Sequence, residues 1–260
     1  LERARGGTRP GTKKAYIAST GARINLIADV GYLSGGSIVS KVVVAAGGTL
    51  YRVSGTSLIA VGTGLATGRH LGYADIDQIL DITGSSGGAV RAFNPATNTL
   101  AAVTPSTSPP AAIPTNCTLA CNYNNRLVLS GDTATPQAIY FSRQEDPADW
   151  DYTVPNDDQA AIAVTTTDQG KIAEAVRCLI PHSQDCMFIG CTSSLWALQG
   201  DLGAGGRLVK LAENIGVFGA RSFCYDTEGR LYFLSQNGVY TLPPGCGTNP
   251  QEISRERHPQ

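Results

Sequence analysis

The stretch Val42-Val43-Val44-Ala45-Ala46-Gly47-Gly48-Thr49-Leu50-Tyr51-Arg52-Val53 decides the fold. An apolar run meets a Gly-Gly turn, and a second run with aromatic and β-branched residues follows. Tight turns of this kind between such runs are the strongest short-range signal for a β-hairpin. A similar pattern returns near the other end of the chain, where residues 221–225, 230–234 and 239–242 are separated by turns that contain Gly229 and Asn237-Gly238. The sequence therefore predicts repeated antiparallel meanders.

The repeats have a regular spacing. Equivalent positions in the Tyr-Arg-Val-like strands are separated by about 41, 48, 56 and 44 residues, at Tyr51, Ala92, Tyr140, Trp196 and Tyr240. Four-stranded propeller blades need about 40 to 50 residues. A Greek-key sandwich also has turns every 8–12 residues, but it does not predict self-similarity at the longer period. We expect an all-β, β-propeller-like fold, with blades that need not form a complete ring in this chain.

Three parts of the chain are expected. Residues 1–41 read as an extended basic arm with the first strands, residues 42–242 as the β-propeller-like domain, and residues 243–260 as a C-terminal extension. An acidic loop lies at residues 144–158. The only candidate for a helix is the short stretch at residues 170–177.

Composition excludes several classes of function. The net charge of −1 gives no support to bulk binding of nucleic acid. No apolar run approaches the roughly 18 residues that span a bilayer, so no membrane anchor is expected. Seven cysteines without paired C-x-x-C spacing argue against a disulfide framework and a zinc site, and predict reduced thiols that behave as small core residues. Cys186, Cys191 and Cys224 lie in strand-like apolar runs, which fits folding in a reducing cytoplasm.

The sequence contains no recognisable catalytic constellation. His70, His182 and His258 are scattered without partner spacing, and no G-x-S-x-G, H-E-x-x-H or P-loop motif is present. The glycine-rich stretches at residues 84–88 and 203–206 are not followed by helical patterns, which favours hairpin turns and loops over phosphate binding. We therefore expect neither an enzyme nor a cofactor or metal site.

The acidic loop and the basic arm are the candidate interaction sites. The carboxylates of the loop are compatible with a solvated or interface loop, with calcium binding, or with acid/base catalysis, and belong to Glu145, Asp146, Asp149, Asp151, Asp157 and Asp158. Trp150 and Tyr152 are expected to anchor the loop to the sheet or to a neighbouring subunit. The basic arm at residues 3–14 either is a solvated leader or contacts an acidic surface of a partner protein. The expected interface residues are Arg3, Arg5, Arg9, Lys13, Lys14, Asp149, Trp150 and Tyr152.

The order of features from Asn125 onward resembles the β-propeller tail proteins of short-tailed bacteriophages, which include the nozzle (tail tubular protein B) and the packaged-DNA stabilisation hub. The stretches that carry the resemblance are residues 125–131, 139–143, 146–152, 157–160, 186–190, 195–198, 213–216, 229–235 and 238–240, with the Ser-Arg-containing segment 253–257. The opening Arg9-Pro10-Gly11-Thr12 is similar to an early segment of that family.

The resemblance implies a virion structural protein that is assembled in the bacterial host cytoplasm and located in the tail. Such a protein would form a homo-oligomeric ring that continues the DNA channel, retains the packaged genome until ejection, and touches the DNA transiently. Its other partners would be the portal or adaptor and a fibre, spike or plug. The alternative is a carbohydrate-binding or carbohydrate-cleaving propeller, which needs aromatic side chains and paired carboxylates at the propeller mouth. A cellular interaction propeller is a third possibility, although WD and kelch signatures are missing.

Overall fold

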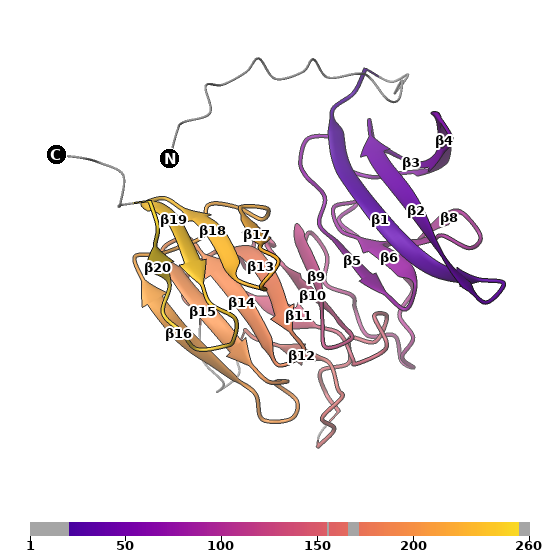
Figure 1. Cartoon of the computed structure of the whole chain (residues 1–260). Helices are drawn as coiled ribbons and strands as arrows, with labels where there is room; N and C mark the ends of the chain where they lie inside the picture. The colour runs from indigo at the N-terminus through magenta and orange to yellow at the C-terminus, as the bar shows by residue number, and fades with distance from the viewer. Residues whose placement is uncertain (1–20, 155, 166–171, 255–260) are drawn as a thin grey trace, which may run out of the picture.

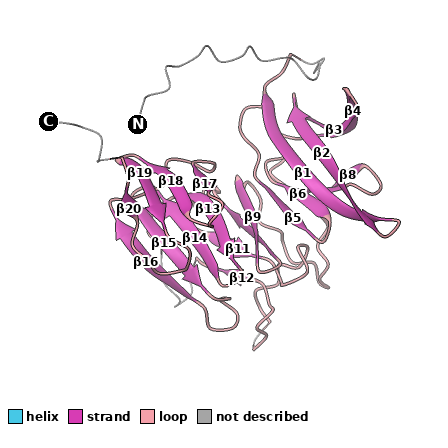
Figure 2. Ribbon diagram, viewed as in Figure 1, coloured by secondary structure: helices cyan, strands magenta, loops and turns pink. Residues whose placement is uncertain are grey.

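The computed structural model describes residues 21–154, 156–165 and 172–254. Within these residues the regular structure is entirely β, with twenty strands in five four-stranded antiparallel sheets and no helix (Figure 2). No described helix could cross a membrane. The prediction of an all-β, propeller-like fold built from antiparallel meanders is confirmed.

Each sheet is a meander in which successive strands are neighbours. The first sheet contains β1 (Ile24–Ser34), β2 (Ser37–Ala46), β3 (Thr49–Ser54) and β4 (Ser57–Thr63). The second contains β5 (Tyr73–Ile76), β6 (Ile79–Ile82), β7 (Arg91–Asn94) and β8 (Thr99–Ala102). The third contains β9 (Leu119–Tyr123), β10 (Arg126–Ser130), β11 (Ile139–Phe141) and β12 (Ile162–Ala163). The fourth contains β13 (Val176–Ser183), β14 (Cys186–Cys191), β15 (Ser194–Gln199) and β16 (Arg207–Glu213). The fifth contains β17 (Phe223–Tyr225), β18 (Leu231–Ser235), β19 (Gly238–Leu242) and β20 (Gln251–Glu252).

The spacing read from the sequence corresponds to the third strand of every sheet. The five equivalent positions lie on β3, β7, β11, β15 and β19, and are Tyr51, Ala92, Tyr140, Trp196 and Tyr240. The turn chemistry also agrees, because Gly47 and Gly48 both have positive φ, of 58° and 80°. A two-residue turn with both φ values positive matches the twist of the strands it joins.

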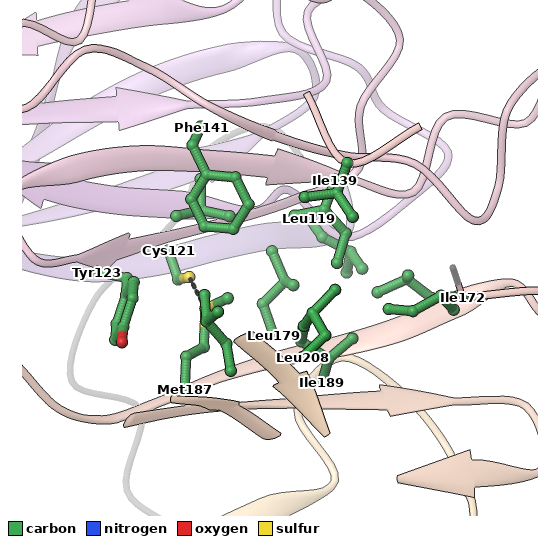
Figure 3. Close-up of a cluster of buried hydrophobic side chains, with 14 of the residues drawn as sticks. Leu119, Cys121, Tyr123, Ile139, Phe141, Ile172, Leu179, Met187, Ile189 and Leu208 are labelled. Carbon is green, nitrogen blue, oxygen red and sulfur yellow. Dashed lines mark hydrogen bonds between the residues drawn. The ribbon is translucent and has the colours of Figure 1, made fainter. Parts of the chain in front are cut away.

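Hydrophobic clusters join each sheet to the next. Successive side chains on a strand point to opposite faces, so an interior sheet contributes to two cores. In the fourth sheet, Leu179 packs in the cluster shared with the third sheet, whereas Cys178 and Ile180 pack in the cluster shared with the fifth. Figure 3 shows the cluster between the third and fourth sheets, where the Cys121 Sγ lies 3.7 Å from the Met187 Sδ.

The five sheets form an arc that does not close into a ring. They follow one another from β1 to β20, with the first and last sheets at its two ends (Figure 1). The four clusters of the described residues join the first sheet to the second, the second to the third, the third to the fourth, and the fourth to the fifth. No cluster of these residues joins the fifth sheet to the first.

Some expected boundaries differ from the observed ones. The expected boundary at residue 41 falls inside β2, because the first sheet already begins at Ile24. The expected C-terminal extension contributes β20, the edge strand of the fifth sheet. The possible helix at residues 170–177 is wrong in its described part, since Val176 begins β13. Residues 166–171 lie outside the described ones.

The cysteines are only partly as expected. Cys117, Cys121, Cys178 and Cys191 are free and buried. The prediction of reduced thiols is wrong for Cys186 and Cys246, which form a disulfide with a Cα–Cα distance of 5.7 Å. Their separation of 60 residues hid the pair, because only the fold brings β14 beside the segment after β19. Cys224 is exposed rather than buried, since it lies on the uncovered side of the last sheet.

Candidate functional site

The expected interface residues of the acidic loop have different surroundings. Trp150 is 1% exposed and packs with Leu127, Leu129 and Ile76 in the cluster between the second and third sheets. Its Nε1 donates a hydrogen bond to the Pro147 carbonyl at 2.9 Å. Of the two roles expected for Trp150, the contacts support the anchor to the sheet, and its burial removes it from any surface that a neighbouring copy could reach.

Of the other expected interface residues, the structure describes only Asp149 and Tyr152. Asp149 is half-buried, and one of its carboxylate oxygens accepts a hydrogen bond from the Asp151 N–H at 2.9 Å. Tyr152 is exposed. The basic residues of the arm, which are Arg3, Arg5, Arg9, Lys13 and Lys14, lie outside the described residues.

The carboxylates of the acidic loop stabilise its own turns. Asp151 accepts hydrogen bonds from the N–H and the hydroxyl of Thr153, which lower the pKa of Asp151. The Gln159 N–H, followed by the Arg143 guanidinium at 2.7 Å, lowers the pKa of Asp157. No group of three or more His, Cys, Asp or Glu side chains in the described parts of the chain is arranged to hold a metal ion. Calcium binding therefore gains no geometric support from the described residues of this loop.

A buried arginine that the sequence did not single out holds the end of this loop. Arg126, on β10, is 1% exposed, and its Nε donates to the Asp201 carboxylate at 2.9 Å. Its two Nη atoms donate at 2.7 to 2.9 Å to the backbone carbonyls of Ser142, Asp158, Gln159 and Ala160. One side chain thus connects the third sheet, the loop and the turn after β15. The turn after β15 approaches the end of the loop so closely that only glycine fits at position 203, because a Cβ there would lie 2.0 Å from the Asp158 carbonyl oxygen.

A cavity of about 610 Å³ lies where the first strands of the second, third, fourth and fifth sheets converge. Its aromatic and polar walls include Tyr73, Asp75, Asn122, Arg221 and Phe223. Arg221, just before β17, extends to the second sheet. Its Nη2 donates to the Leu71 carbonyl at 3.1 Å, and the guanidinium carbon lies 5.9 Å from the Tyr73 ring centroid. The volume is in the range of pockets that hold small organic ligands.

A buried carboxyl group lies beside this cavity. Asp81 is 1% exposed on β6, opposite Ala74 of β5, and its Oδ2 has no hydrogen-bond partner. Burial, followed by repulsion from the Asp75 carboxylate, raises the pKa of Asp81 from 3.8 to about 7. Leu80 and Ile82 pack towards the first sheet, so strand alternation turns Asp81 towards the third. Asp81 is therefore a titratable group inside a contact between sheets.

The first sheet has a second face on which several apolar side chains are exposed. Its apolar side chains lie in register, with Ile27 opposite Val44, Val44 opposite Tyr51, and Val53 opposite Leu58. Ile27 is 55% exposed and Val42 is 40% exposed. We call this surface the first-sheet bare face, and it consists of Ile27, Val42, Tyr51, Val53 and Leu58, which surround the buried Val44.

The fifth sheet has a comparable surface at the other end of the arc. Leu234 lies opposite Val239, and the Ile253 N–H donates to the Val239 carbonyl, which continues the row onto the next strand. Leu234 and Ile253 are each 43% exposed. We call this surface the fifth-sheet bare face, and it consists of Cys224, Tyr232, Leu234, Val239, Thr241 and Ile253.

The sequence analysis missed these surfaces for different reasons. The continuous apolar run at residues 42–46 was a signal for a strand with two apolar faces. The cavity had no such signal, because its walls come from segments between residues 70 and 223.

Comparisons with known proteins show likeness in fold only. No family model and no curated protein matches the chain. PorZ, a bacterial surface component of the type-IX secretion system of Porphyromonas gingivalis, shares 12% identity at a TM-score of 0.55 over 85% of this chain and 33% of its own. The extracellular domain of a putative one component system of B. thetaiotaomicron shares 14% identity at a TM-score of 0.45, over 90% of this chain and 34% of that one. The chain thus spans about a third of the length of the solved structures it matches.

Proposed function

We propose that this chain is a structural component of the tail of a short-tailed bacteriophage, where copies of it form a ring around the DNA channel. The resemblance in the order of motifs from residue 125 onward supports this role. The observation that carries it is the pair of uncovered faces at the two ends of the arc. Contiguous exposed apolar surface is typical of sites where proteins associate.

The proposed role is mechanical. The ring continues the channel, retains the packaged genome before ejection, and offers docking surfaces to the portal or adaptor and to a fibre, spike or plug. The near-neutral net charge of −1 suits a channel wall. DNA must slide past such a wall, and many phosphate contacts would hold it.

Immunogold electron microscopy of phage particles, with antibody against this chain, tests the location. Label on the tail at one vertex is expected. Particles from a producing culture that carry no label would contradict a virion role. Particles from a phage that lacks the gene serve as the control for antibody specificity.

A second candidate is a carbohydrate-binding propeller, and the cavity favours it. Tyr73 and Phe223 offer aromatic surface to a sugar ring, and Asp75, Asn122 and Arg221 offer hydrogen-bonding groups. Glycan-array screening of the wild-type chain and of Tyr73→Ala tests this. Binding that the substitution abolishes would support the candidate, and no binding by the wild type would remove it.

A further inference from the structure

The internal contacts of the arc follow one rule. Each of the three interior sheets uses one face to pack on the preceding sheet and the opposite face to pack on the following sheet. The first sheet presents Val43 and Leu50 to the second, and the fifth presents Phe233 and Leu242 to the fourth. The first-sheet bare face is thus the face that packs on a preceding sheet elsewhere in the arc. The fifth-sheet bare face is the one that packs on a following sheet.

We propose that the fifth-sheet bare face of one copy docks on the first-sheet bare face of the next copy, so that the chain assembles head to tail. This inference rests on the proposed ring-forming function and assigns the surfaces that would form the ring. A contact between two different surfaces of the same molecule is heterologous, and it gives a ring when the rotation closes.

The chemistry of the two faces supports a second copy as the occupant. The row of Leu234, Val239 and Ile253 is apolar, and so is the row of Ile27, Val44 and Tyr51. Each copy carries one face of each kind, so every uncovered face finds a partner in the assembly. The joint would also repeat the relation between following and preceding faces that the four internal contacts already use.

Two polar side chains on these faces, Asp29 and Tyr232, already have hydrogen-bond partners within their own chain. Asp29 lies opposite Val42, and its carboxylate accepts a hydrogen bond from the Ser40 hydroxyl. A carboxylate that already has a donor is easier to cover than an unpaired one. On the other face, Tyr232 directs its hydroxyl to the Asp226 carboxylate at 3.2 Å, so this polar group also has a partner within its own chain.

The first test is self-association of the full chain in solution, measured by analytical ultracentrifugation over a range of concentrations. The wild type should associate as its concentration rises. Val42→Asp and Leu234→Asp each place a charge on one bare face, and each should weaken association by at least about tenfold. Ile59→Asp is the matched control, because Ile59 has the same 40% exposure as Val42 but lies opposite Arg52, on the other side of the sheet. It should associate like the wild type.

Mixing the two variants distinguishes head-to-tail contact from other arrangements. Val42→Asp keeps an intact fifth-sheet bare face, and Leu234→Asp keeps an intact first-sheet bare face. An equimolar mixture should therefore form a 1:1 dimer that grows no further, although each variant alone stays monomeric. Circular dichroism and thermal melting of each variant show whether it is folded. If either aspartate variant unfolds, Ile27→Ser and Ile253→Ser replace the pair.

Several outcomes would overturn the inference. These are a wild type that stays monomeric at every concentration, a mixture that gives no dimer, and association that one of the two substitutions, Val42→Asp or Leu234→Asp, abolishes while the other leaves it unchanged. The last result would indicate contact between like faces. Failure of the proposed function is seen separately. Head-to-tail association by a chain that is absent from phage tails would refute the virion role alone. If phage that carries Val42→Asp and phage that carries Leu234→Asp each build normal tails, only the assignment of the docking faces is refuted.

Discussion

Removal of the Arg126 side chain should destabilise the protein far more than removal of an ordinary arginine. Arg126 is almost completely buried, and it donates to one carboxylate and to backbone carbonyls of the third sheet and the acidic loop. In Arg126→Ala the Asp201 carboxylate, which is itself 11% exposed, loses its charged partner. The four carbonyls lose their donor at the same time.

The expected loss follows from the surroundings of the pair. Breaking a buried ion pair by removing one partner costs roughly 3–5 kcal/mol of unfolding free energy. The orphaned carbonyls would add to this, although water that enters the cavity would offset part of their loss. We expect about 4 kcal/mol for Arg126→Ala, which corresponds to a fall in Tm of roughly 8–16 °C for a chain of this size. Arg126→Lys keeps the charge, but an ammonium group cannot reproduce the planar fork, so it should recover only part of the loss.

Urea denaturation followed by tryptophan fluorescence measures this directly. The chain has two tryptophans, Trp150 beside the third sheet and Trp196 in the fourth, so fluorescence reports on both sides of the contact that Arg126 makes. Arg143→Ala is the control. Its pair with Asp157 is partly exposed, with side-chain values of 30% and 27%, and should contribute less than about 1 kcal/mol.

A double-mutant cycle tests the physical reason. Asp201→Ala combined with Arg126→Ala should show a coupling of roughly 1–3 kcal/mol between the two side chains. Equal and small losses for Arg126→Ala and Arg143→Ala would refute the reasoning, because burial would then make no difference to the arginine. A coupling near zero would show that the carbonyls, and not Asp201, hold Arg126.

Three further predictions concern the core and the loop. Trp150→Ala should lower the unfolding free energy by about 3–5 kcal/mol in denaturant titrations, and any defect in assembly should track this loss of folding. Asp81→Asn should remove a pH dependence of the unfolding free energy. Protonated Asp81 contributes stability that is fully present below about pH 4 and is lost as the pH rises through about 7. Thermal melts across pH 4–8 should therefore show the variant more stable than the wild type at pH 8, by up to about 4 kcal/mol. Gly203→Ala should lower the unfolding free energy by more than about 1 kcal/mol, because its Cβ would overlap the Asp158 backbone; Gly87→Ala, with open space around it, should lie within about 0.5 kcal/mol of the wild type.

The candidate site could be predicted from the sequence only in part. The acidic loop was found because its charges and aromatic residues are adjacent in the chain. The burial of Trp150 depends on β5 and β10, which are remote in sequence, so no local pattern could separate a core anchor from an exposed one. Arg126 shows the same limit, since its partner Asp201 is 75 residues away.

The sequence by itself determined the local structure. Apolar and aromatic alternation fixed the strands, glycines and asparagines with positive φ fixed the turns, and the recurrence of Tyr51, Ala92, Tyr140, Trp196 and Tyr240 fixed one blade per period. These signals need only neighbouring residues. Tertiary structure alone decided which faces are covered, that Cys186 meets Cys246, and that the arc stays open between its first and fifth sheets. The reason is that an apolar face looks the same in the sequence whether another sheet covers it or solvent does, and only the packing of whole sheets decides between them.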